Sequence, residues 1–581
     1  MISPIPPALI YIIGALLIPV IRIRRAQQLF ALLIPVAAFG NLLSIPHGIY
    51  WQFEFLGHEL ILGRVDALSM VFAYIFVIAS FISMVYAIHI KQMGQHTAAY
   101  LYVGSTLGVV LAGDLLSLFV FWEIMAISSV FLIWFRNTKA SSEAGFRYIL
   151  VHMTGGCILL AGIILHVNAS GSLLFVKFDF QTIGAKLILV GFLINAAVPP
   201  FHAWLADAYP EGTITGSIFM TAFTTKSAVY VLARSFPGLE LLIWLGAIMA
   251  LYGVVYAVIE NDIRRLLAYH IISQVGYMVC GVGLGTEMAI NGAGAHAFCH
   301  VLYKAVLFMG AGAVIHVTGR NKMTELQGHD LFRLMPITLT LYMIGAFSIS
   351  AVPLFNGYVS KTMIVAAAGA DHRPSIELLL HLASIGTFMC TGLKLPWGVW
   401  FGTRQSDEDI IPNATEPPLN MLIAMGLGAF LCILTGIYPA VLYRILPYPV
   451  DFHPYKVAYV VAMVQLLLAT LAAFIIYIRK LDGEPAINVD TDWFYRRSGR
   501  FIRRFCETGL EQIRIRTDQL LSEWITILSE WGHYPYQWID LLTKSPSRKN
   551  KIIVHRIPIG SGACLSLVLL SVLILIGLTE T

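Results

Sequence analysis

Runs of about twenty consecutive apolar residues recur from one end of this chain to the other. Hydrophobic residues make up 58% of the 581 residues and charged residues only 12%, a balance far from that of soluble proteins. Each run is long enough to cross the ~30 Å hydrocarbon layer of a bilayer as a helix. Lipid offers the backbone no hydrogen bonds, and helices satisfy their own. We therefore predict an all-α polytopic protein of the cell (inner or plasma) membrane.

About sixteen spans are predicted: 8–21, 29–46, 66–90, 97–115, 117–135, 146–168, 184–206, 214–234, 239–259, 266–286, 290–316, 334–369, 376–402, 418–440, 455–478 and 559–578. In alternate connections, Lys and Arg number 13 on one side and 7 on the other. The more basic side is expected to be cytoplasmic, which places the N-terminus outside. The seven residues of the outer side are Arg64, Lys177, Lys186, Arg234, Arg373, Arg444 and Lys456.

Several classes of chemistry are not expected. The seven cysteines are scattered without a C-x-x-C pair, and the chain has no haem, nucleotide-loop or zinc-protease motif. We therefore expect no cofactor, no metal and no redox or hydrolytic site in this chain, and no nucleic acid among its partners. Redox chemistry, if any, would belong to other subunits.

The stretch from Arg479 to Arg556 carries 14 of the 38 Lys and Arg residues. Its arginines are interleaved with apolar residues such as Trp493, Phe501 and Trp524, which is typical of an amphipathic helix in a membrane interface or along partner helices. A basic tail held by anionic lipid is the alternative. Because the chain is predicted to re-enter the membrane at 559–578, we favour a cytoplasmic helix that holds neighbouring subunits.

Four lysines lie inside or near the edge of apolar runs, namely Lys226, Lys304, Lys361 and Lys394, and Glu123 is the acidic residue in a comparable position. An ionisable group at the bilayer centre costs at least ~2.5–3.5 kcal/mol, so such groups are expected to face the bundle interior and mark an ion path. A buried Lys–Glu pair would suit proton transfer, because each charge favours the ionised form of the other.

His296, His300 and Lys304 recur every four residues in the run 290–316 and therefore share one helix face. A single membrane histidine is usually a packed hydrogen-bonding residue. Two histidines and a lysine on one stripe instead favour a hydrated proton path. His270 either extends this path or caps a helix. His152 lies nearer a predicted span end, where a side chain can reach the interface.

Two similar segments, 197–201 (AVPPF) and 351–355 (AVPLF), lie 154 residues apart inside long apolar runs. Proline interrupts a helix, and paired interruptions in two halves of a chain point to the ion site of an inverted-repeat transporter. Lys361 follows the second segment closely. The predicted helix breaks are at Pro199, Pro200, Pro353 and Gly357.

Seven motifs, in order along the chain, resemble those of the antiporter-like family: 121–123 (FWE), 201–208 (FHAWLADA), 263–269 (IRRLLAY), 272–277 (ISQVGY), 296–298 (HAF), 304–308 (KAVLF) and 356–361 (NGYVSK). That family comprises the large proton-pumping membrane subunits of complex I, their counterparts in membrane-bound hydrogenases, and the Mrp-type sodium/proton antiporter subunits. The resemblance covers about residues 66 to 440.

The resemblance implies a fourteen-helix core with two inverted five-helix repeats and two broken helices, followed by a lateral amphipathic helix and a final transmembrane helix. The domains that we expect are 1–65 (N-terminal helices and an external loop), 66–440 (the proton-translocating core), 441–480 (an additional span), 481–556 (the lateral segment) and 557–581 (the final span).

By motif position, Glu123 matches the characteristic glutamate of the family, Lys226 a lysine of the following helix, Lys304 the central lysine and Lys361 the terminal one. The position that usually carries a lysine on the first broken helix is Asn195 here. Asparagine cannot take up a proton. Either Lys226 replaces that lysine as the partner of Glu123, which we favour, or this half-channel is altered or silent.

We expect the chain to translocate protons through the buried Glu/Lys/His chain, within a complex I-like or Mrp-like assembly. The alternatives are sodium/proton exchange in a non-redox Mrp-type antiporter and, as a third, a non-conducting assembly scaffold. The expected partners are other membrane subunits (antiporter-like neighbours held by residues 481–556), the lipid bilayer, and protons or Na⁺.

Overall fold

The structure is a computed structural model that describes residues 4–55, 57–402, 415–478 and 490–533. The chain divides into two compact units, residues 1–492 and 493–581. The predicted span 559–578 and the lateral residues 481–489 and 534–556 lie outside the described residues.

The described residues in the first half of unit 1 form ten α-helices and one β-hairpin. The helices are α1 Pro7–Leu17, α2 Arg24–Ser44, α3 Ala67–Ala87, α4 Met93–Leu111, α5 Leu115–Trp134, α6 Lys139–Ser170, α7 Ile183–Asn195, α8 Ala203–Ala208, α9 Ile214–Ala222 and α10 Thr224–Ser235. The hairpin strands are β1 Gly48–Phe55 and β2 His58–Val65.

The second half of unit 1 continues with α11 Glu240–Ile259, α12 Ile263–Leu284, α13 Glu287–Thr318, α14 Met323–Leu326, α15 Leu331–Leu334, α16 Pro336–Ile349, α17 Asn356–Ala370, α18 Pro374–Thr387, α19 Leu419–Ile437, α20 Ala440–Tyr443 and α21 Val457–Tyr477. After α18 the helix widens into π-helical turns at Phe388–Lys394 and Trp397–Phe401.

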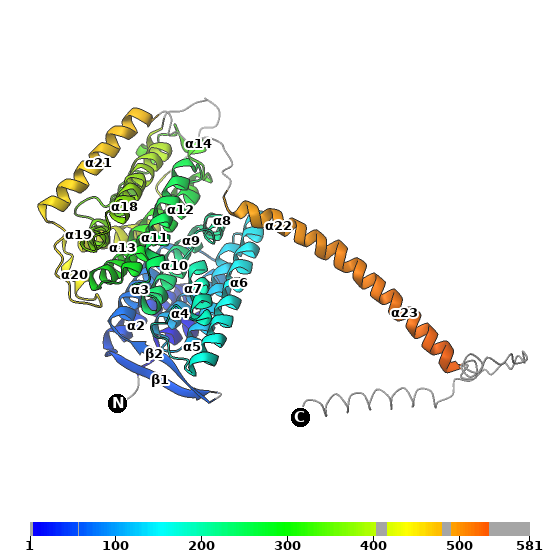
Figure 1. Cartoon of the computed structure of the whole chain (residues 1–581). Coiled ribbons are helices and arrows are strands. Elements are labelled where there is room, and N and C mark those ends of the chain that lie inside the picture. The colour runs from blue at the N-terminus through cyan, green and yellow to red at the C-terminus, as the bar shows by residue number, and fades with distance from the viewer. Residues whose placement is uncertain (1–3, 56, 403–414, 479–489, 534–581) are drawn as a thin grey trace, which may run out of the picture. The chain divides into compact units, whose positions relative to one another are not determined.

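The helices stand together as a bundle whose centre is α12 and α13 (Figure 1). Among the described residues, ten helices are long and apolar enough to cross a membrane. The most apolar stretch of α12 is 100% buried and that of α13 94%, whereas that of α21 is 17% buried and faces outward. The prediction of a mostly helical polytopic membrane protein is confirmed.

The β-hairpin is a departure from the all-α expectation, which treated its residues as an external loop. β1 and β2 pair antiparallel from Gly48↔Val65 to Phe55↔His58. The hairpin is fixed to the bundle at Ile61, whose N–H donates to Asp114 Oδ2 (2.7 Å) and whose carbonyl accepts from Gly113 (2.8 Å). Each strand is only eight residues long, so its alternation of apolar and polar residues is a weak pattern beside the long apolar runs that flank it.

The two similar segments, 197–201 and 351–355, each follow a helix that ends in the same type of turn. Ala197 and Ala351 adopt left-handed backbone conformations, with φ of 56° and 58°. The next N–H in each case returns to a carbonyl five residues earlier, from Val198 to Leu193 (3.1 Å) and from Val352 to Phe347 (3.0 Å). The chain is therefore interrupted between α7 and α8 and again between α16 and α17, as the prolines predicted.

A third interruption separates α9 from α10 and was not predicted. Phe223 departs from helical geometry (φ −105°, ψ −67°), although the local sequence contains neither glycine nor proline. The hydroxyl of Tyr102 on α4 accepts the N–H of Thr224 (3.0 Å), and the Nζ of Lys226 donates to the carbonyl of Thr221 (2.5 Å). Side chains thus satisfy the backbone groups that the interruption frees.

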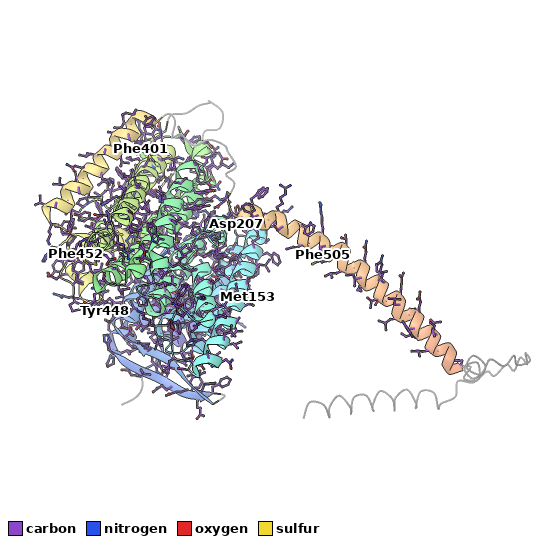
Figure 2. The ribbon with its side chains drawn as sticks, in the orientation of Figure 1. Met153, Asp207, Phe401, Tyr448, Phe452 and Phe505 are labelled. Atoms are coloured by element: carbon purple, nitrogen blue, oxygen red, sulfur yellow. The ribbon has the colours of Figure 1, made fainter. Side chains whose placement is uncertain are left out.

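The second unit begins within α22 Asp492–Arg504 and continues through a π-helical turn, Phe505–Leu510, into α23 Glu511–His533. Side chains stand out along these helices, around the labelled Phe505 (Figure 2). Large apolar side chains are exposed on both helices, including Phe494, Phe501 and Trp524. Helices within 481–556 are thus present where an amphipathic segment was predicted.

Candidate functional site

Lys226, Lys304 and Lys361 are buried in the bundle, with 0%, 0% and 1% of their surfaces exposed. Each Nζ donates to a main-chain carbonyl: Lys226 to Thr221 (2.5 Å), Lys304 to Leu267 on α12 (2.8 Å) and Lys361 to Ile349 at the end of α16 (2.7 Å). None of the three forms an ion pair with a carboxylate within 4.0 Å in the described part of the chain.

Lys226 and Lys361 occupy equivalent places relative to helix interruptions. Each lies in the first two turns after an interruption, and each side chain turns back to a carbonyl in the last turn of the preceding helix, α9 or α16. A carbonyl at a helix end lacks its usual partner and lies at the negative end of the helix dipole. Each interruption therefore provides an acceptor for an ammonium group inside the membrane.

The His296, His300 and Lys304 stripe lies on α13, and all three residues are 0% exposed. His296 Nδ1 lies 2.9 Å from the Oγ of Ser360 on α17, one residue before Lys361. The ring of His300 lies 5.2 Å from that of Tyr303, and neither nitrogen of His300 has a hydrogen-bond partner among the described residues.

His270 on α12 is also 0% exposed, and its two ring nitrogens have no partner in the described chain. It interacts electrostatically with Lys304 and Lys361, and His300 does so with all three lysines. His270 lies well inside α12, seven residues after the helix begins, which excludes the helix cap that the sequence left open. The structure thus brings His270, His300 and the three lysines into one buried polar row.

Glu123 on α5 belongs to a different neighbourhood. Its carboxylate packs against α6 at Gly156, where an added Cβ would lie 1.9 Å from Oε1. Neither of its oxygens has a hydrogen-bond partner among the described residues, and no ion pair joins it to Lys226 in that part of the chain. The expected Glu123–Lys226 pair is therefore not formed in this structure.

Asn195, at the end of α7, pairs with a histidine. Its Oδ1 lies 3.0 Å from Nδ1 of His152, and both residues are buried. His152 lies on α6 one turn before Gly156, the point that Glu123 contacts. Met153, the next residue on α6, points out of the bundle (Figure 2). The expectation that His152 lies near a span end is wrong, because α6 begins at Lys139 and places it well inside the helix.

A group of hydroxyl side chains lies between His152 and Lys226. The Tyr148 ring packs against His152 with centroids 4.2 Å apart and an angle of 46° between the rings, and its hydroxyl lies 2.8 Å from Ser129 Oγ. The Tyr148 hydroxyl also interacts with Thr224, which is 2.6 Å from the hydroxyl of Tyr102 and two residues before Lys226. Sequence reasoning missed these residues because tyrosine and serine are common packing residues in membrane helices.

Lys394 lies apart from the row of three lysines. Its Nζ donates to the carbonyls of Val258 and Glu260, the latter at 3.1 Å, where α11 ends. This is a favourable place for a cation, because the last carbonyls of a helix carry negative partial charge. Lys394 therefore connects the π-helical turn after α18 to the end of α11.

A second polar cluster, also missed from the sequence, lies just after the first interruption. Asp490 precedes α22 and is 6% exposed; it accepts hydrogen bonds from His202 (3.1 Å), Tyr252 on α11 (2.6 Å) and Tyr269 on α12 (2.7 Å). Burial alone would raise the pKa of Asp490, but these hydrogen bonds and the His202 charge outweigh burial and hold it well below its usual range. The partners of Asp490 are more than 220 residues away in sequence, so no local pattern predicts the cluster.

The arrangement is suited to moving protons. Lysine and histidine each exist in a protonated and a neutral form, and a low-dielectric surrounding strengthens the influence of one charge on the next. Lys304 lies near enough to Lys226 and Lys361 for the charge on one lysine to act on the next. Within the described residues, no group of three His, Cys, Asp or Glu side chains is placed to hold a metal ion.

Residues 112–389 match the family described as "NADH:quinone oxidoreductase/Mrp antiporter, TM". The chain is 30% identical over 423 residues to an uncharacterized protein of Methanocaldococcus jannaschii, covering 67% of this chain and 86% of that one. It is 34% identical over 362 residues to the A/B subunit of a probable K⁺/H⁺ antiporter of Rhizobium meliloti, covering 58% of this chain. It is 29% identical over 427 residues to the A subunit of a Na⁺/H⁺ antiporter of Alkalihalophilus pseudofirmus, covering 65% of this chain. The matches span 36% and 52% of these two antiporter subunits, so about half of their length or less.

Two solved structures have the same fold. A chain of the Mrp complex from Dietzia superposes with a TM-score of 0.67 and 21% identity, covering 78% of this chain and 98% of that one. A chain of a membrane-bound sulfane sulfur reductase, described as an archaeal respiratory membrane complex, gives a TM-score of 0.68 and 22% identity, covering 98% and 99%. The chain belongs to the family of antiporter-like membrane subunits that NADH:quinone oxidoreductases and Mrp antiporters share.

Proposed function

We propose that this chain translocates protons within a multi-subunit membrane complex. The observation that carries the proposal is the set of buried groups Lys226, His300, Lys304, His270 and Lys361, which lie on α10, α12, α13 and α17. Burying three lysines without carboxylate partners is costly, and a folded protein keeps such groups in the membrane chiefly where they transport charge.

Protons would pass along the row because neighbouring charges repel. A proton arriving at Lys226 makes the charged form of Lys304 less favourable, and Lys304 acts in the same way on Lys361. The carbonyls of Thr221, Leu267 and Ile349 hold each amine in place between transfers. Histidines between the lysines accept and release protons without moving a main-chain segment.

Protons would enter the N-terminal half of the bundle through Glu123. His152 would act there in place of the family's lysine, whose position Asn195 occupies. Asn195 holds the ring of His152 through Nδ1 and leaves Nε2 free to exchange protons. The hydroxyls of Tyr148, Thr224 and Tyr102 continue from there towards Lys226. This route differs from the direct Glu123–Lys226 pair that the sequence predicts.

The transported ion in this proposal is the proton rather than Na⁺ or K⁺. The antiporter relatives are named for exchange of these cations with H⁺, but the buried row consists mainly of nitrogen bases. Hard cations bind oxygen ligands, whereas lysine and histidine bind protons. The partners would be either redox subunits or small antiporter subunits. Mass spectrometry of the complex purified from its native membrane would distinguish these two sets.

The test is Lys304→Ala in the complex reconstituted into liposomes. We expect proton flux to fall at least ten-fold while the complex stays assembled, since the central proton carrier is removed. Lys322→Ala is the matched control: Lys322 lies on the surface, and its ion pair with Glu325 is exposed. Proton flux unchanged by Lys304→Ala would refute the central path.

A further inference from the structure

Lys226, Tyr230 and Arg234 follow one another at intervals of four residues on α10 and therefore share one face of that helix. Lys226 and Tyr230 are 0% exposed, and Arg234 is 9% exposed. Lys226 and Arg234 are separated by about 12 Å along the helix axis. Arg234 lies in the last turn of α10 and belongs to the basic residues that the charge bias predicts on the outer side. This face of α10 therefore leads from Lys226 towards the outer end of the bundle.

The guanidinium of Arg234 is held at two points. Its Nε donates to the hydroxyl of Tyr230 (2.9 Å), and its Nη2 donates to Oδ1 of Asp66 (2.7 Å), the residue that caps α3. The other oxygen of Asp66 pairs with Arg64 (3.3 Å). The side chains of Asp66 and Arg64 are 34% and 35% exposed, whereas that of Arg234 is 6% exposed. Water therefore screens Asp66 and Arg64, while Arg234 brings its charge into the bundle.

A hydrogen-bonded chain for protons ends at a guanidinium. Each step of proton transfer needs a group that can accept one proton and release another, but arginine has no acceptor and stays protonated in proteins. Because the Tyr230 hydroxyl already accepts from a cation, a further proton at that oxygen is unfavourable. The Tyr230 ring packs against Phe72 on α3 with centroids 5.4 Å apart, and such an apolar surrounding does little to screen the repulsion.

A protein that carries protons along buried groups needs closures, because a path open to both faces at once would dissipate the proton gradient. A fixed arginine charge is one way to exclude protons from a pore. We propose that Arg234 is such an electrostatic barrier: it closes the outer end of this face of α10 and directs the protons of Lys226 towards Lys304. The inference rests on the proposed function for the charge that Lys226 carries, and on the contacts of Arg234 for the barrier.

The test measures the passive proton leak of the full complex in liposomes, with no driving reaction and with neither Na⁺ nor K⁺ present. A pH-sensitive dye inside the vesicles reports the response to an outside pH step, and thiocyanate compensates the charge that moves. In Arg234→Gln the amide can still form hydrogen bonds with both partners but carries no charge. We expect this variant to leak protons at least ten-fold faster than the unmodified complex. The flux of choline, which cannot pass along hydrogen bonds, should stay the same.

Asp66→Asn is the matched control, because it breaks the same ion pair and leaves the guanidinium on Tyr230. Asparagine is also a good helix cap, so the start of α3 is preserved. We expect this variant to be as tight as the unmodified complex. Arg234→Gln combined with Lys226→Ala should lose the leak again, since Lys226 supplies the protons.

Arg234→Lys decides the question even if the Arg234→Gln complex does not assemble. It keeps a cation beside Asp66, Arg64 and Tyr230, but an ammonium group, unlike a guanidinium, can give up its proton. We expect its leak to equal that of the unmodified complex at pH 7 and to exceed it several-fold at pH 10. Equal leaks at both pH values would count against the barrier.

An Arg234→Gln leak no faster than that of the unmodified complex would overturn the proposal. An equal leak in Asp66→Asn or a parallel rise in choline flux would also overturn it, since either result indicates loosened packing instead of a lost charge. A leak that persists without Lys226 would show that the protons take another route, which refutes the proposal as well. The driven proton flux of the Lys304→Ala experiment tests the proposed function separately, so that function can fail while the leak still decides whether Arg234 closes the outer end.

Discussion

Asn195 and His152 form a buried pair at a position where the resemblance leads one to expect a lysine. An amide can donate and accept hydrogen bonds but carries no charge, so it can be buried beside a histidine at far lower cost than a lysine. The His152 ring also contacts the rings of Tyr148 and Trp204, with centroids 4.2 Å and 4.5 Å away, and these contacts fix it further. A titratable group thus remains in this half of the molecule, on α6 instead of α7.

Asn195→Ala is expected to destabilise the protein because it leaves Nδ1 of His152 buried without a partner. The cost of such an unsatisfied group is about 1–3 kcal/mol. The measurement is the Tm of the purified complex in one detergent, compared with Asn41→Ala, where the amide donates to Ile5 at an exposed site (2.8 Å). Equal small shifts in both variants would contradict this assignment.

Only some of the candidate site residues can be recognised from the sequence alone. Lys304 and Lys361 stand out because a charge in an apolar run has few structural reasons to be there. His152, Tyr148 and Tyr102 do not stand out, because uncharged polar residues are common in membrane helices. The role proposed for them rests on the side chains that pack beside them, and a single sequence does not contain that information.

At the scale of the elements, the junction between α16 and α17 depends on a close backbone approach. A Cβ at Gly357 would lie 1.8 Å from the carbonyl oxygen of Ser348, so any larger residue must displace the start of α17. Lys361 lies one turn further along α17, and its bond to Ile349 spans the same junction.

Gly357→Ala is therefore expected to lower both the Tm and the proton flux, with a packing cost of at least about 1–3 kcal/mol. Gly426→Ala on α19 is the matched control, since a Cβ there would meet no other atom within 4 Å. Both properties are measured on the same preparations. A Gly357→Ala complex with the Tm and flux of Gly426→Ala would refute the close approach.

Asp490, two residues before α22, is hydrogen-bonded to His202, Tyr252 and Tyr269 of the bundle. Because its pKa is lower in the folded protein than in the unfolded chain, the ionised carboxylate stabilises the fold. That stabilisation is complete above the unfolded-state pKa of about 3.9 and is lost as the pH falls through the lower folded-state pKa.

Asp490→Asn is expected to lower the Tm at pH 7, by the equivalent of about 2 kcal/mol, because charged hydrogen bonds become neutral ones. The difference from wild type should narrow when the Tm is measured at pH 3, where the wild type begins to lose the same contribution. Asp451→Asn, at a fully exposed side chain, should change little at either pH. A deficit of the same size at both pH values would contradict the role of the carboxylate charge.

At the scale of the whole molecule, α22 and α23 carry exposed apolar side chains, such as Phe501 (73% exposed) and Ile502 (58%). Exposed apolar surface of this extent marks an interaction with other subunits or with lipid. That residues 481–556 hold neighbouring subunits stays a prediction.

Truncation before Arg479 is expected to reduce the yield of intact complex several-fold, since contacts along α22 and α23 would be lost. The measurement is native electrophoresis of the purified complex. A finer version compares Phe501→Asp with Ser498→Asp, which adds the same charge at an exposed polar position of the same helix. Wild-type yield of the truncated chain, or equal effects of the two point variants, would count against an assembly role.

The sequence by itself determined the membrane class, most of the spans, the two proline interruptions and the buried lysines. These follow from hydrophobic length, from the missing N–H of proline and from the cost of charge in lipid, which are properties of a segment and its solvent. Only the tertiary structure decided the hairpin, the interruption at Phe223, the His152–Asn195 pair and the Asp490 cluster. Each of these depends on hydrogen bonds or packing between residues far apart in the chain, and such contacts exist only once the helices are assembled.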